Sequence, residues 1–348
     1  MKKTALITGI RGQDAAYLSQ LLLEKGYKVI GTDRRSGGAT KWRLERLGVV
    51  DKIVYEYMDL VEFHNVCEII EKYQPDECYN LAAQSFVQAS FSQPFVTSNV
   101  NFFGVLNLLE AIRKYSPKTK FYQASTSEMF GKIQENPQTE KTPFYPKSPY
   151  GVAKLASHWE VINYRESYNL FACCGILFNH ESPLRGEEFV TRKITKGLIN
   201  WYHNQEPIYL GNIYARRDFS HAKDAVNAMW LMLQQKEPKE YVIASGQTYS
   251  IKDFINECLK QLHVNYKWIN ENKGVKEYCI DQKLNSFYDT SKIVIIDPTF
   301  FRPNEVDILR GWSEKAKKEL GWSPSYGFES LIKEMLEEDA KLYNTVKK

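Results

Sequence analysis

A glycine turn between two apolar runs near the start of the chain limits the fold more than any other feature. Residues 4–8 are mostly apolar, residues 15–25 carry Leu18, Leu21 and Leu22 at helical spacing, and residues 28–32 are again largely apolar. This pattern predicts a strand, a helix and a second strand. Gly9 and Gly12 lie between the first strand and the helix, where a glycine turn lets the backbone approach an anion such as a pyrophosphate. A plain strand-to-helix turn is the alternative interpretation.

The alternation continues to about residue 180. Apolar runs predict further strands at 53–58, 77–81, 121–124 and 171–178. Helical stretches separate them at 61–72, 99–115 and 150–168. Repeated strand–helix units predict an α/β fold with a doubly wound parallel sheet.

The pattern becomes mixed after residue 180. Helices are expected at 191–203, 222–235, 251–261 and 313–320, and an amphipathic helix from residue 328 onward. We therefore expect a dinucleotide-binding domain over residues 1–180, with returning segments near 210–240. A smaller, mixed α/β domain over residues 181–348 is expected to bind the substrate.

Composition and residue spacing exclude several classes of protein. The 348 residues are 43% hydrophobic and 25% charged, which excludes disordered and collagen-like chains. A net charge of +4, with no block of like charges, predicts no nucleic-acid partner. No apolar run approaches the roughly 18 residues of a membrane helix, so we expect neither a membrane span nor a signal peptide. Six cysteines without Cys-x-x-Cys spacing and six scattered histidines predict reduced thiols, a cytoplasmic protein and no metal site.

The end of the second predicted strand carries two conflicting signals about the dinucleotide. Asp33 stands where an acidic residue binds the ribose hydroxyl of NAD, whereas Arg34, Arg35 and Ser36 suit the 2′-phosphate of NADP. Two adjacent guanidiniums beside a hydroxyl favour NADP, with Asp33 paired to one of them. A solvated basic loop is the alternative.

Tyr150 and Lys154 stand four residues apart, on one face of a predicted helix. A nearby cation lowers the pKa of a tyrosine, so Tyr150 could act as a base on a substrate hydroxyl in hydride transfer. Thr126 and Glu128 follow the predicted strand 121–124, at the sheet edge where ligands bind. An alcohol dehydrogenase does not need this carboxylate, so Glu128 indicates a second proton transfer. The alternative for Glu128 is an acidic residue that stabilises a helix start.

Four motifs together carry a resemblance to a known family. They are the glycine turn from Gly9, the segment 80–85, the Ser-Thr-Ser-Glu segment 125–128, and the Tyr-x-x-x-Lys pair. With these motifs the chain resembles the extended short-chain dehydrogenase/reductases that act on nucleotide sugars, which have a Rossmann-type sheet. The segments 177–193, 210–218, 221–224 and 302–307 resemble the GDP-mannose 4,6-dehydratases within that family.

The resemblance implies an NADP-dependent lyase that makes GDP-4-keto-6-deoxymannose from GDP-mannose, ahead of GDP-fucose or GDP-rhamnose. Tyr150, assisted by Thr126 and Lys154, would take the proton of the C4 hydroxyl while C4 gives a hydride to NADP. Glu128 would then remove the C5 proton and help the C6 hydroxyl to leave as water. The hydride would finally return to C6, so that NADP is recycled in the site.

The resemblance also implies which residues hold the two ligands. Cofactor contacts are implied for Gly9, Ile10, Arg11, Gly12, Gln13, Asp14, Arg34, Arg35, Asp59, Leu60, Leu81, Ala82, Ala83, Gln84, Ser85, Lys154, His180 and Arg185. Substrate contacts are implied for Ser85, Thr126, Glu128, Tyr150, Asn179, Lys193, Arg216, Arg302 and Glu305. The loop from Arg34 to Ser36 reaches a neighbouring subunit in this family, which implies a homo-oligomer, either a dimer or a tetramer.

Three residues depart from the family pattern. Ala15 stands where a glycine is usual, Phe86 where a histidine is common, and Val96 where an aromatic residue is common. These departures concern the contacts with the cofactor rather than the reaction. Other functions stay open: a 4-epimerase, which does not require Glu128, a UDP-sugar decarboxylase, a reductase that consumes NADPH, and a non-catalytic dinucleotide-binding regulator.

Overall fold

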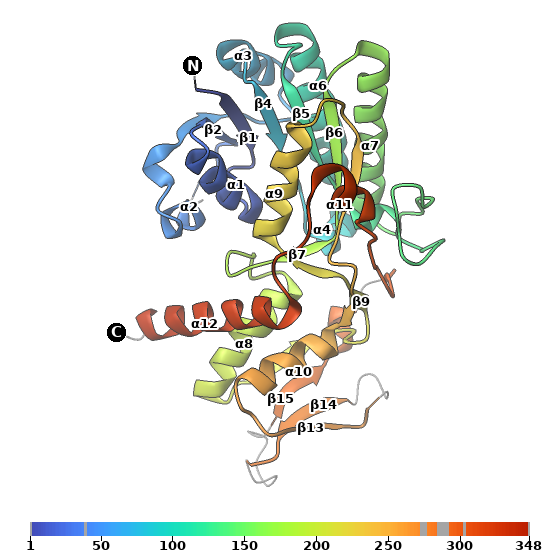
Figure 1. The fold of residues 1–348 in the computed structure, drawn as a ribbon. Helices are drawn as coiled ribbons and strands as arrows, with labels where there is room; N and C mark the ends of the chain where they lie inside the picture. The colour runs from blue at the N-terminus through green and yellow to red at the C-terminus, as the bar shows by residue number, and fades with distance from the viewer. Residues whose placement is uncertain (1, 38–39, 272–276, 284–291, 302–303, 347–348) are drawn as a thin grey trace.

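The computed structural model describes residues 2–37, 40–271, 277–283, 292–301 and 304–346. These residues form two lobes, drawn one above the other in Figure 1. The upper lobe is built on a seven-stranded parallel sheet with helices on both faces. The lower lobe contains a four-stranded mixed sheet and the helices α8, α10 and α12.

The large sheet has the strand order β11-β6-β5-β4-β1-β2-β3. Its strands are β1 (Thr4–Thr8), β2 (Lys28–Asp33), β3 (Val54–Tyr57), β4 (Glu77–Asn80), β5 (Lys120–Thr126), β6 (Ala172–Leu177) and β11 (Glu240–Ile243). The predicted doubly wound parallel sheet is therefore confirmed. The chain order reverses between β1 and β4, where an open parallel sheet leaves a crevice for ligands. β11 is not among the strands predicted from the sequence.

Helices cover both faces of this sheet (Figure 1). One face carries α1 (Gln13–Glu24), α9 (Ala222–Leu233) and α11 (Glu314–Leu320), with α2 (Trp42–Arg46) beside them; the other carries α3 (Phe63–Tyr73), α6 (Gly104–Tyr115) and α7 (Pro149–Tyr168). Side chains of a strand alternate between the faces, so Cys173 and Cys174 lie in different cores and are both fully buried. The prediction that they are core residues is confirmed.

One described helical stretch, Pro94–Tyr115, is long and apolar enough by composition to cross a membrane. It joins α5 (Pro94–Ser98), a π-helical segment η2 (Asn99–Phe103) and α6. Its contacts with α3 and α7 account for apolar residues such as Leu108 and Leu109, which are fully buried. A short helix, α4 (Val87–Ser92), precedes it.

The lower lobe has its own core. Its sheet contains β8 (Ile208–Leu210), β13 (Tyr266–Ile269), β14 (Tyr278–Asp281) and β15 (Lys292–Ile296), and its helices are α8 (Val190–Asn204), α10 (Ile251–Gln261) and α12 (Phe328–Val346). Two small sheets pair β7 (Asn179–Glu181) with β10 (Phe219–His221), and β9 (Arg216–Arg217) with β12 (Tyr249–Ser250). The helices expected after residue 180 are confirmed within a few residues of their predicted ends.

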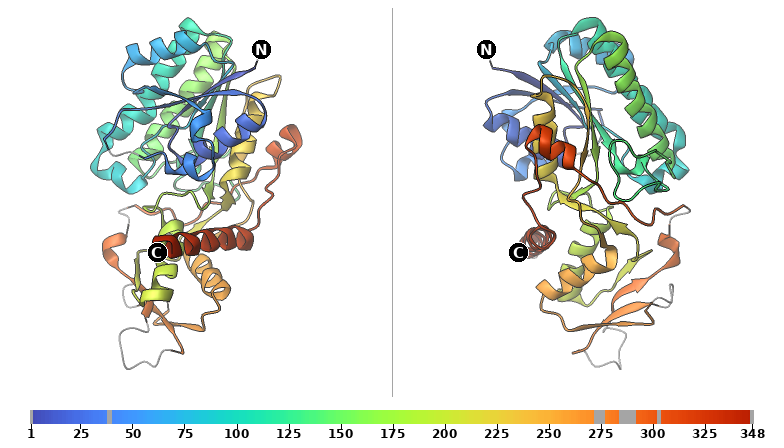
Figure 2. Two further views of the ribbon diagram at one scale, coloured as in Figure 1. Left: turned by 90° about the vertical axis from the view of Figure 1, so that its left-hand side faces the viewer. Right: turned by 45° about the vertical axis from the view of Figure 1, so that its right-hand side comes forward.

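Helix α12 connects the two lobes near the C-terminus (Figure 2). Its Asp339 forms a buried ion pair with Arg192 of α8, with 2.6 Å between Oδ1 and Nη2. Its Glu338 pairs with Arg46 of α2 in the upper lobe. The first pair lies within the lower lobe, whereas the second, which is partly exposed, links α12 to the upper lobe. The division of the chain at residue 180 stays a prediction.

Candidate active site

A cleft of about 550 Å³ lies between the two lobes, at the carboxyl ends of the parallel strands. Residues from the glycine turn, the loop after β4, β5 and α7 line its upper side, and residues from β7, α8 and the segment before Glu305 line its lower side. Of the predicted site residues, the cleft brings together Gly12, Gln13, Asp14, Leu81, Ala83, Ser85, Thr126, Glu128, Tyr150, Lys154, Asn179, His180, Arg185, Lys193 and Glu305. Residues far apart in sequence thus meet at one site.

The glycine turn depends on the absence of side chains. Gly9 has a φ of +66°, and a Cβ there would lie 2.8 Å from Cα of Ala82. Gly12 is the N-cap of α1 and supplies no side-chain capping bond. The first turn of α1 therefore presents backbone N–H groups and the positive end of the helix dipole to the cleft.

The end of β2 differs from the sequence expectation in one contact. Asp33 pairs with the guanidinium of Arg11 and accepts the backbone N–H of Arg34 at 2.8 Å. Arg11 also donates to Oγ of Ser36 at 3.0 Å. The expected pairing of Asp33 with the side chain of Arg34 or Arg35 is wrong, because Arg11 reaches Asp33 from the adjacent turn. Arg34 and Arg35 are exposed.

Hydrogen bonds from buried polar residues hold the loop after β4. Oγ1 of Thr8 accepts the backbone N–H groups of Leu81 and Ala82, at 3.1 Å and 3.0 Å. The side chain of Asn101, in the π-helical segment, bonds to both the N–H and the carbonyl of Gln84, at 2.8 Å and 2.9 Å. The sequence analysis missed Thr8 and Asn101, whose only signal is a polar residue within an apolar run. Both position the predicted cofactor-binding loop.

The side chains of three predicted cofactor residues are buried or bonded to the neighbouring backbone. Ile10 and Leu60 are buried at 2% and 5% exposure, so their side chains belong to the core. Asp59 follows β3, and its carboxylate accepts the N–H of Val61 at 3.2 Å. A cofactor that reaches these positions would meet mainly backbone groups of Ile10 and Leu60.

The start of α7 brings the catalytic candidates together. Ser148 caps the helix, with its Oγ accepting the N–H of Gly151 at 3.0 Å. A Cβ on Gly151 would lie 2.8 Å from the carbonyl oxygen of Glu128, so only glycine lets α7 start this close to the end of β5. Thr126 accepts the N–H of Glu128 at 3.2 Å, and both residues line the cleft together with Tyr150. A phenol, a hydroxyl and a carboxylate therefore share one wall of the cleft.

Burial dominates the titration of the Tyr150–Lys154 pair. Burial raises the pKa of Tyr150 to about 12, against the lowering effect of the hydrogen bond with Thr126. Burial also lowers the pKa of Lys154 to about 8. The Lys154 nitrogen lies 6.0 Å from the centroid of the Tyr150 ring and donates to the carbonyl of Ala124 at 2.9 Å. The expectation of a tyrosine pKa lowered by Lys154 is wrong here, because desolvation disfavours both charged forms.

The lowered pKa of Lys154 has a measurable effect on stability. The unfolded chain, in which the pKa of Lys154 is 10.5, binds more protons than the folded chain between pH 8 and 10.5, so stability rises with pH there. This residue should add about 2 kcal/mol to the free energy of unfolding between about pH 7.5 and 9.5. Urea unfolding at both pH values should show this gain in the wild type but not in Lys154→Met. Equal pH dependence in the two proteins would contradict the assignment.

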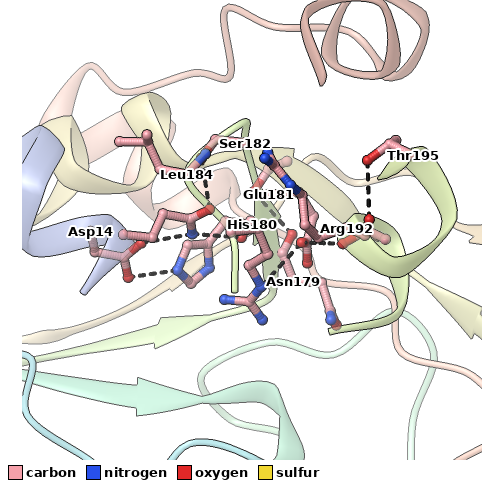
Figure 3. Close-up of polar contacts among 12 residues, drawn as sticks. Asp14, Asn179, His180, Glu181, Ser182, Leu184, Arg192 and Thr195 are labelled. Atoms are coloured by element: carbon pink, nitrogen blue, oxygen red, sulfur yellow. Dashed lines mark hydrogen bonds and ion pairs between the residues drawn. The ribbon is translucent and has the colours of Figure 1, made fainter. Parts of the chain in front are cut away.

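An ion pair joins the glycine turn to β7, as Figure 3 shows. Nε2 of His180 lies 2.7 Å from Oδ2 of Asp14. Although burial opposes both charges, the pairing lowers the pKa of Asp14 and raises that of His180. Gln13 adds bonds to the carbonyl of His180 at 3.1 Å and to Oγ of Ser182 at 2.7 Å. The cofactor side of the cleft is thus linked directly to the strand that carries Asn179.

Charged groups line the lower side of the cleft. Lys193, in the first turn of α8, lies with its nitrogen 3.8 Å from the centroid of the Phe300 ring, and burial lowers its pKa. Glu305 accepts from Nη2 of Arg217 at 3.0 Å. A lysine and an arginine suit a diphosphate group. The predicted residue Arg302 lies outside the described residues.

Arg217, not Arg216, lines the cleft. Arg216 donates to the carbonyl of Thr248 at 2.7 Å and lies 3.6 Å from the carboxylate of Asp253. Successive residues of a strand point to opposite sides, so only one of this pair can face the ligand. Arg216 is therefore not brought into the cleft lining with the other predicted substrate residues, and its substrate contact stays a prediction.

Arg43 of α2 is a second cleft residue that the sequence analysis missed. Its guanidinium donates to the carbonyls of Leu184 and Arg11, at 2.7 Å and 2.9 Å. It thereby joins the segment after β7 to the glycine turn. Nothing in its local sequence distinguishes it from other basic residues. Among the described residues, no group of three or more His, Cys, Asp or Glu is placed to hold a metal ion.

Comparisons with known proteins agree on one family. A family model described as GDP-mannose 4,6 dehydratase matches residues 6–335. The chain is 48% identical to a GDP-mannose 4,6-dehydratase of Vibrio cholerae, over 97% of this chain and 94% of the relative. It is 45% identical to GDP-mannose 4,6 dehydratase of Homo sapiens, over 99% of this chain and 93% of the human protein.

Solved structures share the fold at lower sequence identity. UDP-glucose 4-epimerase of Thermotoga maritima, solved with UDP-glucose, aligns with a TM-score of 0.80 at 23% identity, over 98% of this chain and 99% of the epimerase. dTDP-glucose 4,6-dehydratase of Bacillus anthracis, solved with NAD, aligns with a TM-score of 0.78 at 20% identity, over 98% of each chain. Both structures share with this chain the fold and the arrangement of the two lobes.

Proposed function

Because the chain belongs to the GDP-mannose 4,6-dehydratase family, we propose that it removes water from GDP-mannose to form GDP-4-keto-6-deoxymannose. This reaction is the first step toward GDP-fucose or GDP-rhamnose. The observation that carries the proposal is the meeting of Tyr150, Lys154 and Glu128 in one cleft. The first two residues suit oxidation of a hydroxyl, and the carboxylate suits elimination of water.

The chain takes a nicotinamide dinucleotide, and its residues fit that group. The first turn of α1 offers N–H groups to a pyrophosphate beside Gly9 and Gly12. Arg185, His180 and Lys154 line the same part of the cleft. When bound, the nicotinamide supplies a hydride acceptor at C4 of the sugar and a hydride donor at C6.

NADP is the proposed dinucleotide. The Asp33 carboxylate, which would bind a ribose hydroxyl in an NAD site, is held by Arg11 and by the N–H of Arg34. The exposed Arg35 and its neighbour Ser36 are free of that carboxylate and suit a 2′-phosphate.

Arg35→Ala should therefore weaken NADP much more than NAD. Loss of one charge-assisted contact with the 2′-phosphate is expected to raise the Kd for NADP about tenfold or more. The Kd for NAD, which lacks that phosphate, should change by less than about twofold. Titration calorimetry with both dinucleotides measures the ratio, and the control is Arg113→Ala, at an arginine of α6 that pairs with Glu110 and does not line the cleft. Equal losses for NADP and NAD would favour the solvated-loop interpretation.

Tyr150 takes the proton of the C4 hydroxyl in the first half-reaction. The hydrogen bond with Thr126 favours the phenolate, and Lys154 on the next turn of α7 adds a cation when protonated. Gly151 and the Ser148 cap keep this helix start against β5. The residues therefore hold the base in position before the sugar arrives.

Glu128 carries the second half-reaction. Oxidation at C4 makes the C5 hydrogen acidic, and a carboxylate can remove that proton. The same group can deliver a proton to the C6 hydroxyl, which leaves as water. Glu128 is partly buried and lines the cleft beside Thr126, so it can reach the same sugar that meets Tyr150.

Residues of the lower lobe hold the GDP-sugar. Lys193 and Arg217 suit the diphosphate, and Asn179 and Glu305 suit hydroxyl or base groups. The polar residues of both lobes thus face one ligand. Small-molecule sites often lie at the interface between two domains.

A single incubation tests the proposed reaction. The purified protein is mixed with GDP-mannose and a catalytic amount of NADP+, and the product is analysed by mass and proton NMR. Loss of one water, a new 6-methyl signal and no net NADPH are expected. Unchanged GDP-mannose would contradict the proposed sugar or base, and UDP- and dTDP-sugars would then be tried in the same assay.

We also propose a cytoplasmic homo-oligomer, either a dimer or a tetramer. The described cysteines are all buried as free thiols, which suits a reducing compartment. The exposed loop from Arg34 to Ser36 is the segment that reaches a neighbouring subunit in similar proteins. Sedimentation velocity measures the oligomeric state, and a monomer would contradict the assignment.

A further inference from the structure

We propose that Phe86 and Phe189 form a latch across the mouth of the cleft, which holds the two lobes around a bound GDP-sugar and slows its release. Phe86 belongs to the upper lobe and Phe189 to the lower lobe. The inference rests on the proposed GDP-sugar substrate and assigns residues that control how long it stays bound.

The two rings meet at the edge of the cleft. Their centroids lie 6.1 Å apart and their planes make an angle of 83°, which is the favoured edge-to-face geometry of aromatic pairs. Both residues line the cleft, yet Phe86 keeps 37% of its surface exposed and Phe189 is partly exposed. Residues that line a cleft and also face solvent lie at its mouth, so this contact spans the opening.

Both phenylalanines occupy positions that favour other residue types. Phe86 is the N-cap of α4 and Phe189 is the N-cap of α8, and neither supplies a side-chain capping bond. N-caps favour Ser, Thr, Asp and Asn, whose side chains accept a backbone N–H. Ser148 of α7 and Ser250 of α10 do so in this chain. Helix stability therefore does not account for either phenylalanine, whereas contact between the lobes does.

Phe189 is fixed on its lower-lobe side. The guanidinium carbon of Arg185 lies 3.7 Å from the centroid of the Phe189 ring, a cation–π contact. Arg185 is itself held by Glu181, with 3.1 Å between Nε and Oε2. The carbonyl of Phe189 accepts the N–H of Lys193 at 2.9 Å. Phe189 is therefore held in place by Arg185 and by the start of α8.

Phe86 is joined to the ligand loop of the upper lobe. It follows Ser85 directly, and its carbonyl accepts from Nε2 of Gln84 at 3.1 Å. The latch thus links the loop after β4 with the start of α8, which are separated by about a hundred residues of sequence. Phe86 precedes α4 of the upper lobe and Phe189 precedes α8 of the lower lobe, so movement of these two helix starts away from each other must separate the rings.

A double-mutant cycle tests the latch. The cofactor-loaded protein binds GDP carrying a fluorescent ribose label, and excess GDP displaces it in a stopped-flow experiment. Phe86→Ala and Phe189→Ala should each raise the dissociation rate constant about three- to tenfold, and the double variant should release no faster than the faster single variant. Phe86→Tyr should restore the wild-type rate constant. Phe95→Ala, at a side chain that is 83% exposed and outside the cleft lining, is the matched control.

Two further readouts separate the latch from a structural role and from the proposed function. The single-turnover rate of dehydration at saturating GDP-mannose and the thermal midpoint should stay within about twofold and about 2 °C of the wild type. The latch would be contradicted if the effects of the two substitutions on the dissociation rate constant multiplied in the double variant, or if neither substitution changed that rate constant. Either result would leave the proposed function standing. Failure of the wild type to bind GDP would contradict the proposed substrate itself.

Discussion

Tyr150→Phe is expected to reduce the formation of GDP-4-keto-6-deoxymannose by about 1,000-fold or more. Removal of a general base costs roughly 100- to 10,000-fold, and the phenol oxygen is the group that hydrogen-bonds to Thr126 beside the substrate cleft. Because Tyr150 is 8% exposed and phenylalanine keeps its ring, the variant should fold normally. The rate constant is measured by product NMR at saturating GDP-mannose.

The controls for Tyr150→Phe address binding and surface effects. The Kd for GDP should change by less than about twofold, since the lost hydroxyl acts on the sugar. Tyr145→Phe, at a ring that is 56% exposed, should retain full activity. More than about one tenth of the wild-type rate in Tyr150→Phe would remove this residue from the role of base.

Glu128→Gln is expected to separate the two halves of the reaction. The amide keeps the size of the side chain but accepts no proton at neutral pH, so loss of water should fall by about 100- to 10,000-fold. Oxidation at C4 should remain near the wild-type rate, because Tyr150, Thr126 and Lys154 are unchanged. A single turnover in D2O, analysed by mass and NMR, should show the 4-keto sugar without loss of water or deuterium uptake at C5.

A matched variant and an opposite outcome make this test decisive. The matched variant is Glu166→Gln, which changes an exposed glutamate of α7 and should have wild-type activity. Full dehydration by Glu128→Gln would exclude Glu128 from the elimination. Loss of C4 oxidation together with dehydration would instead indicate that Glu128 acts on the first step, as a residue that positions the sugar.

The local part of the site could be predicted from the sequence because it depends on short-range geometry. Two residues that stand four positions apart in a helix lie on the same face, so the spacing of Tyr150 and Lys154 alone places them together. Thr126 and Glu128 follow a parallel strand, and the ends of such strands meet at one edge of the sheet. The turn needs a backbone conformation that favours glycine, as the φ of +66° at Gly9 shows, so the glycines themselves indicate the turn.

Several other features depended on contacts that the local sequence does not encode. The partner of Asp33 is Arg11 rather than an adjacent arginine, because the turn and the strand end meet only in the folded sheet. The unpredicted strands β11 and β8 pair with β6 and β15, which are distant from them in sequence. Arg43 reaches the cleft from α2 only because Leu184 and Arg11 offer it two carbonyls.

By itself, the sequence determined the parallel sheet, the glycine turn and the placement of Tyr150 and Lys154 on one helix face, since periodicity and spacing act over a few residues. The tertiary structure alone decided that Arg217 lines the cleft instead of Arg216, because strand alternation leaves two registers possible until the sheets pack. It also decided that the pKa of Tyr150 is raised, to about 12, rather than lowered. The physical reason is desolvation, which depends on how many distant segments bury a group and not on its neighbours in sequence.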